Sequence, residues 1–166
     1  MHKNELVGTI AEFKNAWTQE RPDLDPTAVA TDLRMQLVAR HFANSSNSAL
    51  SDFDLEWWEY DVLSALRRIG KPYVCAANSI NDILPLTSGA LTHRLNRLVD
   101  RKLVTRRGDD HDRRRVLVKL TSKGLSLVNS AAKARFQAAE NTVQALSNTD
   151  RANLDRILDK LLPAAL

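Results

Sequence analysis

The sequence predicts a mainly α-helical protein with one small β-hairpin, and three observations support this fold class. Apolar residues recur at intervals of three and four along most of the chain, which is the spacing of amphipathic helices. Residues 103–120 differ, because two runs of alternating apolar and polar residues flank a glycine-containing turn there. Positive charge is concentrated in the same region. A helix followed by a hairpin (a β-wing) with a cationic tip is the layout of a winged helix-turn-helix, here with additional helices on both sides.

The N-terminal part of the chain is predicted to form two amphipathic helices. The first spans residues 4–18 and is followed by two prolines, so residues 1–25 are interpreted as an extra helix and a turn. The second spans residues 26–48 and carries two apolar stripes, so it packs on two sides. One of these sides can face another subunit, and residues 26–50 are therefore predicted to be a dimerisation helix. The apolar stripe of the first helix consists of Leu6, Ile10, Phe13 and Trp17.

Residues 51–121 are predicted to form the winged helix-turn-helix unit. A third helix at residues 55–69 is followed by a short helix at 76–84, and Pro85 then forces a turn into a helix at 88–98. Two helices joined by a tight turn are the helix-turn-helix arrangement.

Side chains that accept a hydrogen bond from a free backbone N–H predict where helices begin. Three of the predicted helices each offer two candidate residues for this cap. The candidates are Asp52 or Asp54 for the helix at 55–69, Thr87 or Ser88 for the helix at 88–98, and Asn148 or Thr149 for the last helix.

The helix at 88–98 has two different faces. Leu91, Leu95 and Leu98 recur at intervals of four and three residues and form one stripe that faces the core. The opposite face carries small, amide and cationic side chains, which fit a groove and can hydrogen-bond to base edges. This face consists of Gly89, His93, Asn96 and Arg97.

The charge distribution supports a polyanionic partner. Residues 93–119 hold ten Lys or Arg and four Asp, a net charge of +6. The whole chain carries only +4, so the remaining residues sum to −2. A positive field confined to one helix and one hairpin is what a nucleic-acid surface needs, because neutralising phosphates releases counterions. The alternative is a charged surface that contacts only solvent. This alternative does not explain why the excess positive charge lies on the predicted recognition helix and hairpin.

Residues 122–166 are predicted to form two C-terminal helices that take part in dimerisation. Apolar residues recur at helical spacing from Leu125 to Leu146 and again from Leu154 to Leu161. A compact winged unit leaves these helices without an obvious partner inside the monomer. The alternative is that they cover the core of their own chain.

Enzymatic and metal-binding signals are weak, so neither a catalytic residue, a metal nor a cofactor is predicted. The four histidines are scattered without the spacing of metal ligands, and the five glycines form no phosphate-binding loop. No apolar run approaches the length of a membrane span, and the N-terminus lacks the apolar core of a signal peptide. With a single cysteine, Cys75, the expected location is the cytoplasm.

Two motifs in residues 88–121 resemble the MarR family of transcription regulators. The match runs from about residue 30 to 145 and keeps its spacing. One departure is Lys102, where the family usually has glycine just past the recognition helix. A residue with a side chain would be strained in the left-handed conformation that glycine adopts there. The motifs are Ser-Gly-Ala-Leu-Thr-x-Arg-Leu-x-Arg-Leu at 88–98 in the recognition helix, and Asp112-x-Arg114 followed by Val116-x-Val118-x-Leu120-Thr121 in the wing.

The resemblance implies a homodimer that represses genes by binding a pseudo-palindromic double-stranded DNA operator. Residues 51–121 would then be the DNA-binding domain, with Arg114 entering the minor groove from the wing and Asp112 orienting its guanidinium group. The recognition helix would face the major groove. The residues expected at the DNA are Ser88, Gly89, Thr92, His93, Asn96, Arg97, Asp112, Arg113 and Arg114.

A small-molecule site is predicted on the flank of the recognition helix. Arg94 lies about 60° from the leucine stripe, and Asp61 lies on the flank of the third helix beside Trp58 and Val62. Half-buried charges at such positions need partners, so an Asp61–Arg94 pair is expected. Arg106 begins the hairpin and can converge on the same place.

The N-terminal arm and the third helix resemble the PecS/HucR branch of the family, whose members respond to urate. The similar segments are Trp17 with Glu20–Asp25, and Glu59–Leu63. The resemblance implies that Trp17, Asp61, Arg94 and Arg106 bind urate or a related purine. A flat purine anion can stack on an indole and accept hydrogen bonds from guanidinium groups.

Two alternatives remain. The protein can be a MarR-type repressor that responds to phenolic compounds, or to an oxidant through Cys75, whose reactivity would need a lowered thiol pKa and exposure. It can also be a winged-helix adaptor that binds proteins rather than DNA. Steep salt dependence of DNA binding separates the regulator from the adaptor.

Overall fold

The computed structural model of the chain divides into two compact units, Met1–Asn44 and Ser45–Leu166, and each is described by itself. Helix α2 (Thr27–Ser51) begins in the first unit and ends in the second. The residues that the structure describes are 3–81, 83–84, 87–109, 112 and 115–164.

The first unit contains helix α1 (Lys3–Glu20) and most of helix α2 (Thr27–Ser51). Both helices were expected from their apolar spacing, and α2 begins where the Asp25 carboxylate accepts a hydrogen bond from the Thr27 backbone N–H at 3.0 Å. Few side chains of this unit are buried; Ile10 and Ala30 are examples. Trp17 is 43% exposed, so much of its indole remains available for a further contact.

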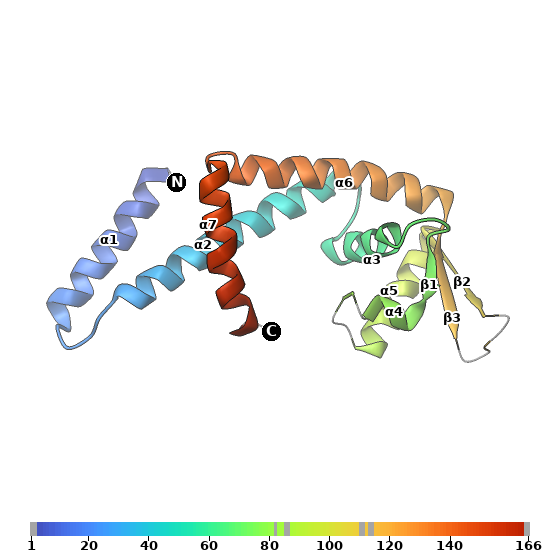
Figure 1. The fold of residues 1–166 in the computed structure, drawn as a ribbon, viewed down its shortest axis with the longest axis horizontal. Coiled ribbons are helices and arrows are strands. Elements are labelled where there is room, and N and C mark those ends of the chain that lie inside the picture. Colours follow the sequence, from blue (N-terminus) through green and yellow to red (C-terminus); the bar gives the residue numbers. More distant parts are fainter. Residues whose placement is uncertain (1–2, 82, 85–86, 110–111, 113–114, 165–166) are drawn as a thin grey trace. The chain divides into compact units, whose positions relative to one another are not determined.

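The second unit holds the winged helix-turn-helix and two C-terminal helices (Figure 1). Its hydrophobic core lies between helices α3 and α5 and the sheet, and includes the fully buried Leu63, Leu66, Leu98 and Val118. Helix α3 also packs along α6. The elements are α3 (Trp57–Arg68), β1 (Val74–Ala76), α4 (Ala77–Asn81), α5 (Ser88–Asp100), β2 (Val104–Gly108), β3 (Val116–Leu120), α6 (Ser122–Val143), α7 (Asn148–Leu161) and a 3₁₀ turn (Leu162–Ala164).

The sheet has three antiparallel strands in the order β1-β3-β2. The β2–β3 hairpin confirms the predicted wing, with Arg106 opposite Val118. The sequence analysis missed strand β1, which pairs with the other edge of β3 and places Cys75 opposite Val118. The helix predicted from residue 76 begins at Ala77. A strand of three residues is too short to show alternation, so only pairing with β3 defines it.

The capping predictions were correct for α5 and wrong for two other helices. Thr87 Oγ1 accepts a hydrogen bond from Ala90 N at 3.3 Å, as expected. Helix α3 begins after Glu56 rather than after Asp52 or Asp54, and its first turn is closed by the Glu56 backbone N–H, which donates to Glu59 Oε2 at 3.1 Å. Helix α7 is capped by Ser147, which forms a reciprocal capping box with Asp150, rather than by Asn148 or Thr149.

The end of α5 is a Schellman turn, and Lys102 occupies its left-handed position with φ 59°. The backbone N–H of Lys102 donates to Val99 O at 2.8 Å, and that of Leu103 donates to Leu98 O at 2.9 Å. Leu98 and Leu103 are both fully buried, which supplies the hydrophobic contact of this motif. Lys102 is therefore a left-handed residue with a side chain, at the position where the family usually has glycine. The two hydrogen bonds define the point where the chain leaves α5.

Candidate nucleic-acid interface

Helix α5 presents the two faces that its sequence predicts. Leu91, Leu95 and Leu98 are 3%, 1% and 0% exposed, so the leucine stripe is part of the core. Ser88 is the first residue of the helix. The side chains on the remaining surface that the structure describes as exposed include Thr92, His93, Asn96 and Arg97, together with Gly89.

One flank of α5 carries three arginines at helical spacing, and each contacts the segment 54–59 at the start of α3. The guanidinium carbons of Arg94 and Arg97 lie 5.6 and 4.9 Å from the ring centre of Trp58. Both distances are within the range of cation–π attraction. The indole of Trp58 is therefore shared by two guanidinium groups of the recognition helix.

Three ion pairs complete this flank. Arg97 Nη2 lies 2.9 Å from Glu56 Oε1, and the other oxygen of Glu56 accepts the indole N–H of Trp58 at 2.7 Å. Both hydrogen bonds lower the pKa of the Glu56 carboxyl, and the one from Trp58 has the larger effect. Arg101 Nη1 lies 2.7 Å from Glu59 Oε2, and its Nη2 reaches both the backbone and the carboxylate of Asp54. Segment 54–59 thus engages every arginine on this flank.

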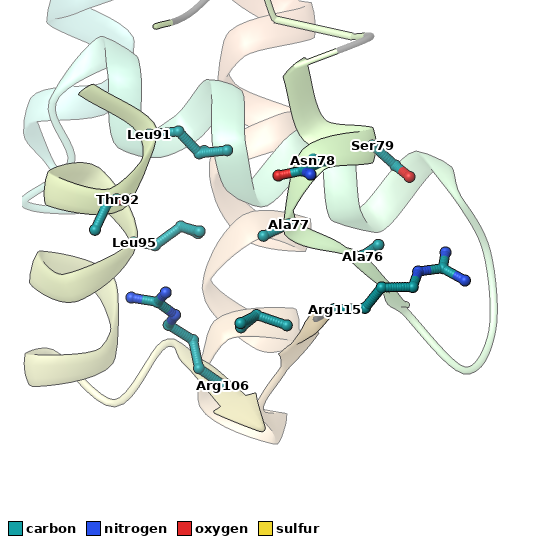
Figure 2. A pocket seen from close by; sticks show the side chains of 10 residues that line it. Ala76, Ala77, Asn78, Ser79, Leu91, Thr92, Leu95, Arg106 and Arg115 are labelled. Atoms are coloured by element: carbon teal, nitrogen blue, oxygen red, sulfur yellow. The ribbon is translucent and has the colours of Figure 1, made fainter. Parts of the chain in front are cut away.

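The opposite flank of α5 contacts the wing. Arg106 Nη1 on β2 donates to Asn96 Oδ1 at 2.6 Å. Beside this contact is a pocket of about 270 Å³ between α4, α5 and the hairpin. Figure 2 shows that Arg106 extends toward α5, whereas Arg115 extends away from it. The pocket is lined by Ala76, Ala77, Asn78, Ser79, Leu91, Thr92, Leu95, Arg106, Arg115 and Val116.

The base of the wing tip is closed by backbone hydrogen bonds. Asp109 N donates to Arg115 O at 3.0 Å, and Arg115 N donates to Asp112 O at 2.9 Å. Asp112 is exposed. Arg113 and Arg114, the two wing arginines of the predicted interface, lie outside the described residues.

Of the four predicted ligand residues, Asp61 and Arg94 lie close enough to interact electrostatically, and Arg106 lies elsewhere. Asp61 is half-buried, and burial raises the pKa of its carboxyl, while the positive charge of Arg94 opposes this shift. Arg106 contacts Asn96, which lies about 200° around α5 from Arg94, so it reaches the opposite flank of the helix. Trp17 belongs to the first unit, and its place beside Asp61 stays a prediction.

The structure adds two arginines around Asp61 that the sequence analysis missed. Arg68 and Arg135 also lower the pKa of the Asp61 carboxyl against the effect of burial. Arg68 follows Asp61 by seven residues on α3, so its position on the same helix face was available from the spacing. Arg135 comes from α6, where its guanidinium carbon lies 5.3 Å from the ring centre of Trp57, and only the tertiary structure places it there.

Among the described residues, no group of His, Cys, Asp and Glu side chains is arranged to hold a metal ion. No helix in the described part of the chain is long and apolar enough to cross a membrane. Burial raises the pKa of the Cys75 thiol, which disfavours the reactive thiolate form.

The small antiparallel sheet beside a helix-turn-helix, in an otherwise helical chain, defines a winged-helix protein. Residues 53–115 match the profile of the MarR family. MarR from Escherichia coli is 31% identical over 122 residues, which are 70% of this chain and 80% of that protein. The chain belongs to the MarR family, which is a family of transcriptional regulators rather than of enzymes.

Other relatives refine this placement. The transcriptional regulator PecS from Dickeya dadantii is 26% identical over 152 residues, 92% of either chain. A crystal structure of a mutant E. coli MarR in complex with operator DNA has a TM-score of 0.69 and 25% identity, covering 89% of this chain and 98% of that one. BpsR from Bordetella bronchiseptica, whose DNA binding is regulated by 6-hydroxynicotinic acid, gives a TM-score of 0.65 at 27% identity, covering 79% and 91%.

Proposed function

We propose that this protein is a ligand-responsive repressor that binds a pseudo-palindromic operator as a homodimer. The observation that carries this proposal is the orientation of α5, which buries its leucines and leaves a polar face between its own arginine flank and Arg106 of the wing. This face would enter the major groove, and the wing would reach the neighbouring minor groove. The MarR relative in complex with operator DNA supports this use of the fold.

Dimerisation is proposed from apolar side chains that the chain leaves exposed. Phe136 on α6 is 74% exposed, and Ile157, Leu158 and Leu161 form an exposed stripe on α7. Burying such a stripe against a second copy is favourable by roughly 25 cal/mol for each Å² of apolar surface. A two-fold dimer would place its two recognition helices about one DNA turn apart, roughly 34 Å.

DNA binding is tested by fluorescence anisotropy with DNA from upstream of the protein's own gene, at two salt concentrations. We expect tight binding that weakens steeply with salt, because phosphate contacts release counterions. Replacing Arg114 by alanine is expected to weaken binding by more than about tenfold, since an arginine in the minor groove contributes at the scale of a base contact. Unchanged affinity of this variant would remove Arg114 from the interface. Weak binding without salt dependence would favour the protein-binding adaptor.

We propose further that the effector is a small flat anion, urate or a related purine, held near Asp61 and Arg94. Arg68 and Arg135 add positive charge around the single carboxylate of Asp61, so the cluster has an excess of guanidinium groups. Guanidinium groups bind planar anions through paired hydrogen bonds, and the indole of Trp17 would stack on the ring. Regulation of BpsR by 6-hydroxynicotinic acid, also a flat heteroaromatic ring, supports this class of ligand.

Ligand release is tested by titrating urate into the protein–DNA complex. Arg94→Ala and Trp17→Ala are each expected to need at least about tenfold more urate for half-release, the scale of one charge-assisted or stacking contact. A wild-type response in both would contradict the proposed site. If Arg106→Ala alone loses the response, the ligand binds instead in the pocket of about 270 Å³ between α5 and the wing. Release by phenolic compounds only, or by peroxide only, would favour the corresponding alternative.

A further inference from the structure

Two of the ion pairs between segment 54–59 and the arginine flank of α5, Glu59–Arg101 and Glu56–Arg97, differ in their exposure to solvent. The side chain of Glu59 is 1% exposed and that of Arg101 is 30% exposed, so this pair is largely enclosed. The side chains of Glu56 and Arg97 are 57% and 46% exposed. Exposed pairs are weak, because water and salt compete with them, whereas enclosed pairs are hard to separate. One pair is therefore suited to fix α5, and the other is suited to open.

Arg97 belongs to the polar face of α5 that the proposed function directs toward DNA. It lies about 100° around the helix from Asn96 and about 40° from His93. Its guanidinium group is turned away from that face in the free protein, toward Glu56 and the ring of Trp58. A guanidinium group binds carboxylate and phosphate oxygens in the same way, so a DNA phosphate can replace Glu56 as its partner.

We infer that Glu56 competes with the DNA backbone for the guanidinium group of Arg97. In the free protein Glu56 holds Arg97 beside the start of α3, and when DNA binds, a phosphate takes its place. This inference rests on the proposed DNA-binding function and adds a determinant of affinity to it. Glu56 keeps a hydrogen bond from the indole N–H of Trp58, at 2.7 Å, when Arg97 leaves. Glu56 therefore stays in place and can recapture Arg97 when the DNA dissociates.

The consequence concerns attraction to DNA of any sequence. Phosphate contacts supply essentially all of the non-specific affinity of DNA-binding proteins. A carboxylate that engages a backbone-directed arginine lowers this affinity, because part of the binding free energy is spent on separating the pair. Glu56 would thus limit the occupation of unrelated DNA by the positively charged surface.

The test is Glu56→Gln, measured by anisotropy on duplexes of random sequence at two salt concentrations. Glutamine can still accept the indole N–H of Trp58 but loses the charge that holds Arg97. We expect binding to become about threefold tighter at low salt, the scale of one exposed ion pair, with a smaller gain at high salt. In a protein that also carries Arg97→Ala, Glu56→Gln is expected to produce little of this increase in DNA affinity.

Asp23→Asn is the matched control, because Asp23 forms a similarly exposed pair with Arg21 at 2.6 Å, in the turn between α1 and α2 and outside the winged unit. It removes the same charge and is expected to leave DNA affinity unchanged. Equal or weaker binding by Glu56→Gln, or an undiminished gain without Arg97, would overturn the inference. If the wild-type protein binds no duplex at all, the proposed DNA-binding function fails instead, so the two failures are distinguishable.

Discussion

Replacing Arg101 by methionine is expected to lower the free energy of unfolding by about 3–5 kcal/mol, the range measured when one partner of a buried ion pair is removed. The carboxylate of Glu59 would then be buried without its cation. Its Oε2 would retain only the backbone N–H of Glu56 at 3.1 Å, and its Oε1 already lacks a hydrogen-bond partner among the described residues. The substitution also removes the hydrogen bonds from Arg101 to Asp54, so of the three flank arginines only Arg94 and Arg97 would still hold α5 to the start of α3.

The measurement is urea denaturation of the variant and the wild type. Adding Glu59→Gln to Arg101→Met is expected to recover more than half of the loss, because the amide is neutral and keeps an oxygen for Glu56 N. Arg21→Met is the control, since Arg21 pairs with Asp23 at 2.6 Å with both side chains more than half exposed, and it should leave the midpoint unchanged. A midpoint shift for Arg101→Met no larger than that of the control would show that Glu59 does not depend on Arg101.

Replacing Gly124 by alanine is expected to destabilise the fold by about 3 kcal/mol or more, at the upper end of the cost of overpacking. Gly124 is the third residue of α6, and its N–H donates to the capping hydroxyl of Thr121 at 2.9 Å. A Cβ at this position would overlap the carbonyl oxygen of Leu103 and lie 2.9 Å from its carbonyl carbon. That carbonyl also accepts the backbone N–H of Thr121 at 3.1 Å, so it cannot move away without breaking the junction between α5, the wing and α6.

Gly89→Ala is the matched control for this prediction. Gly89 is also close to the start of a helix, but a Cβ there would meet nothing within 4 Å. This substitution is expected to leave stability unchanged or to raise it by about 0.5–1 kcal/mol, because alanine loses less backbone freedom than glycine. Thermal unfolding of both variants decides the matter. Equal melting temperatures for the two variants would show that the close approach of Gly124 to Leu103 does not affect stability.

The elements that the sequence determined are those encoded by local periodicity. Leucines at three- and four-residue spacing define the buried face of α5, and alternating residues define the two strands of the wing. The cap at Thr87 could also be predicted, because a hydroxyl directly before a helix acts on the next turn. These signals depend on neighbours within a few positions, which is why the winged helix could be recognised without coordinates.

What only the tertiary structure decided are the partners of side chains that lie far apart in the chain. Strand β1 exists because β3 pairs with it, and Asp54 leaves its predicted capping role to bind Arg101, 47 residues away. In the same way Arg97 lies against Glu56 rather than extending from the groove face, and Arg106 contacts Asn96 rather than Asp61 and Arg94. Spacing places a charge on a helix face, but the direction of a long flexible side chain depends on the nearest opposite charge or acceptor, which the fold supplies.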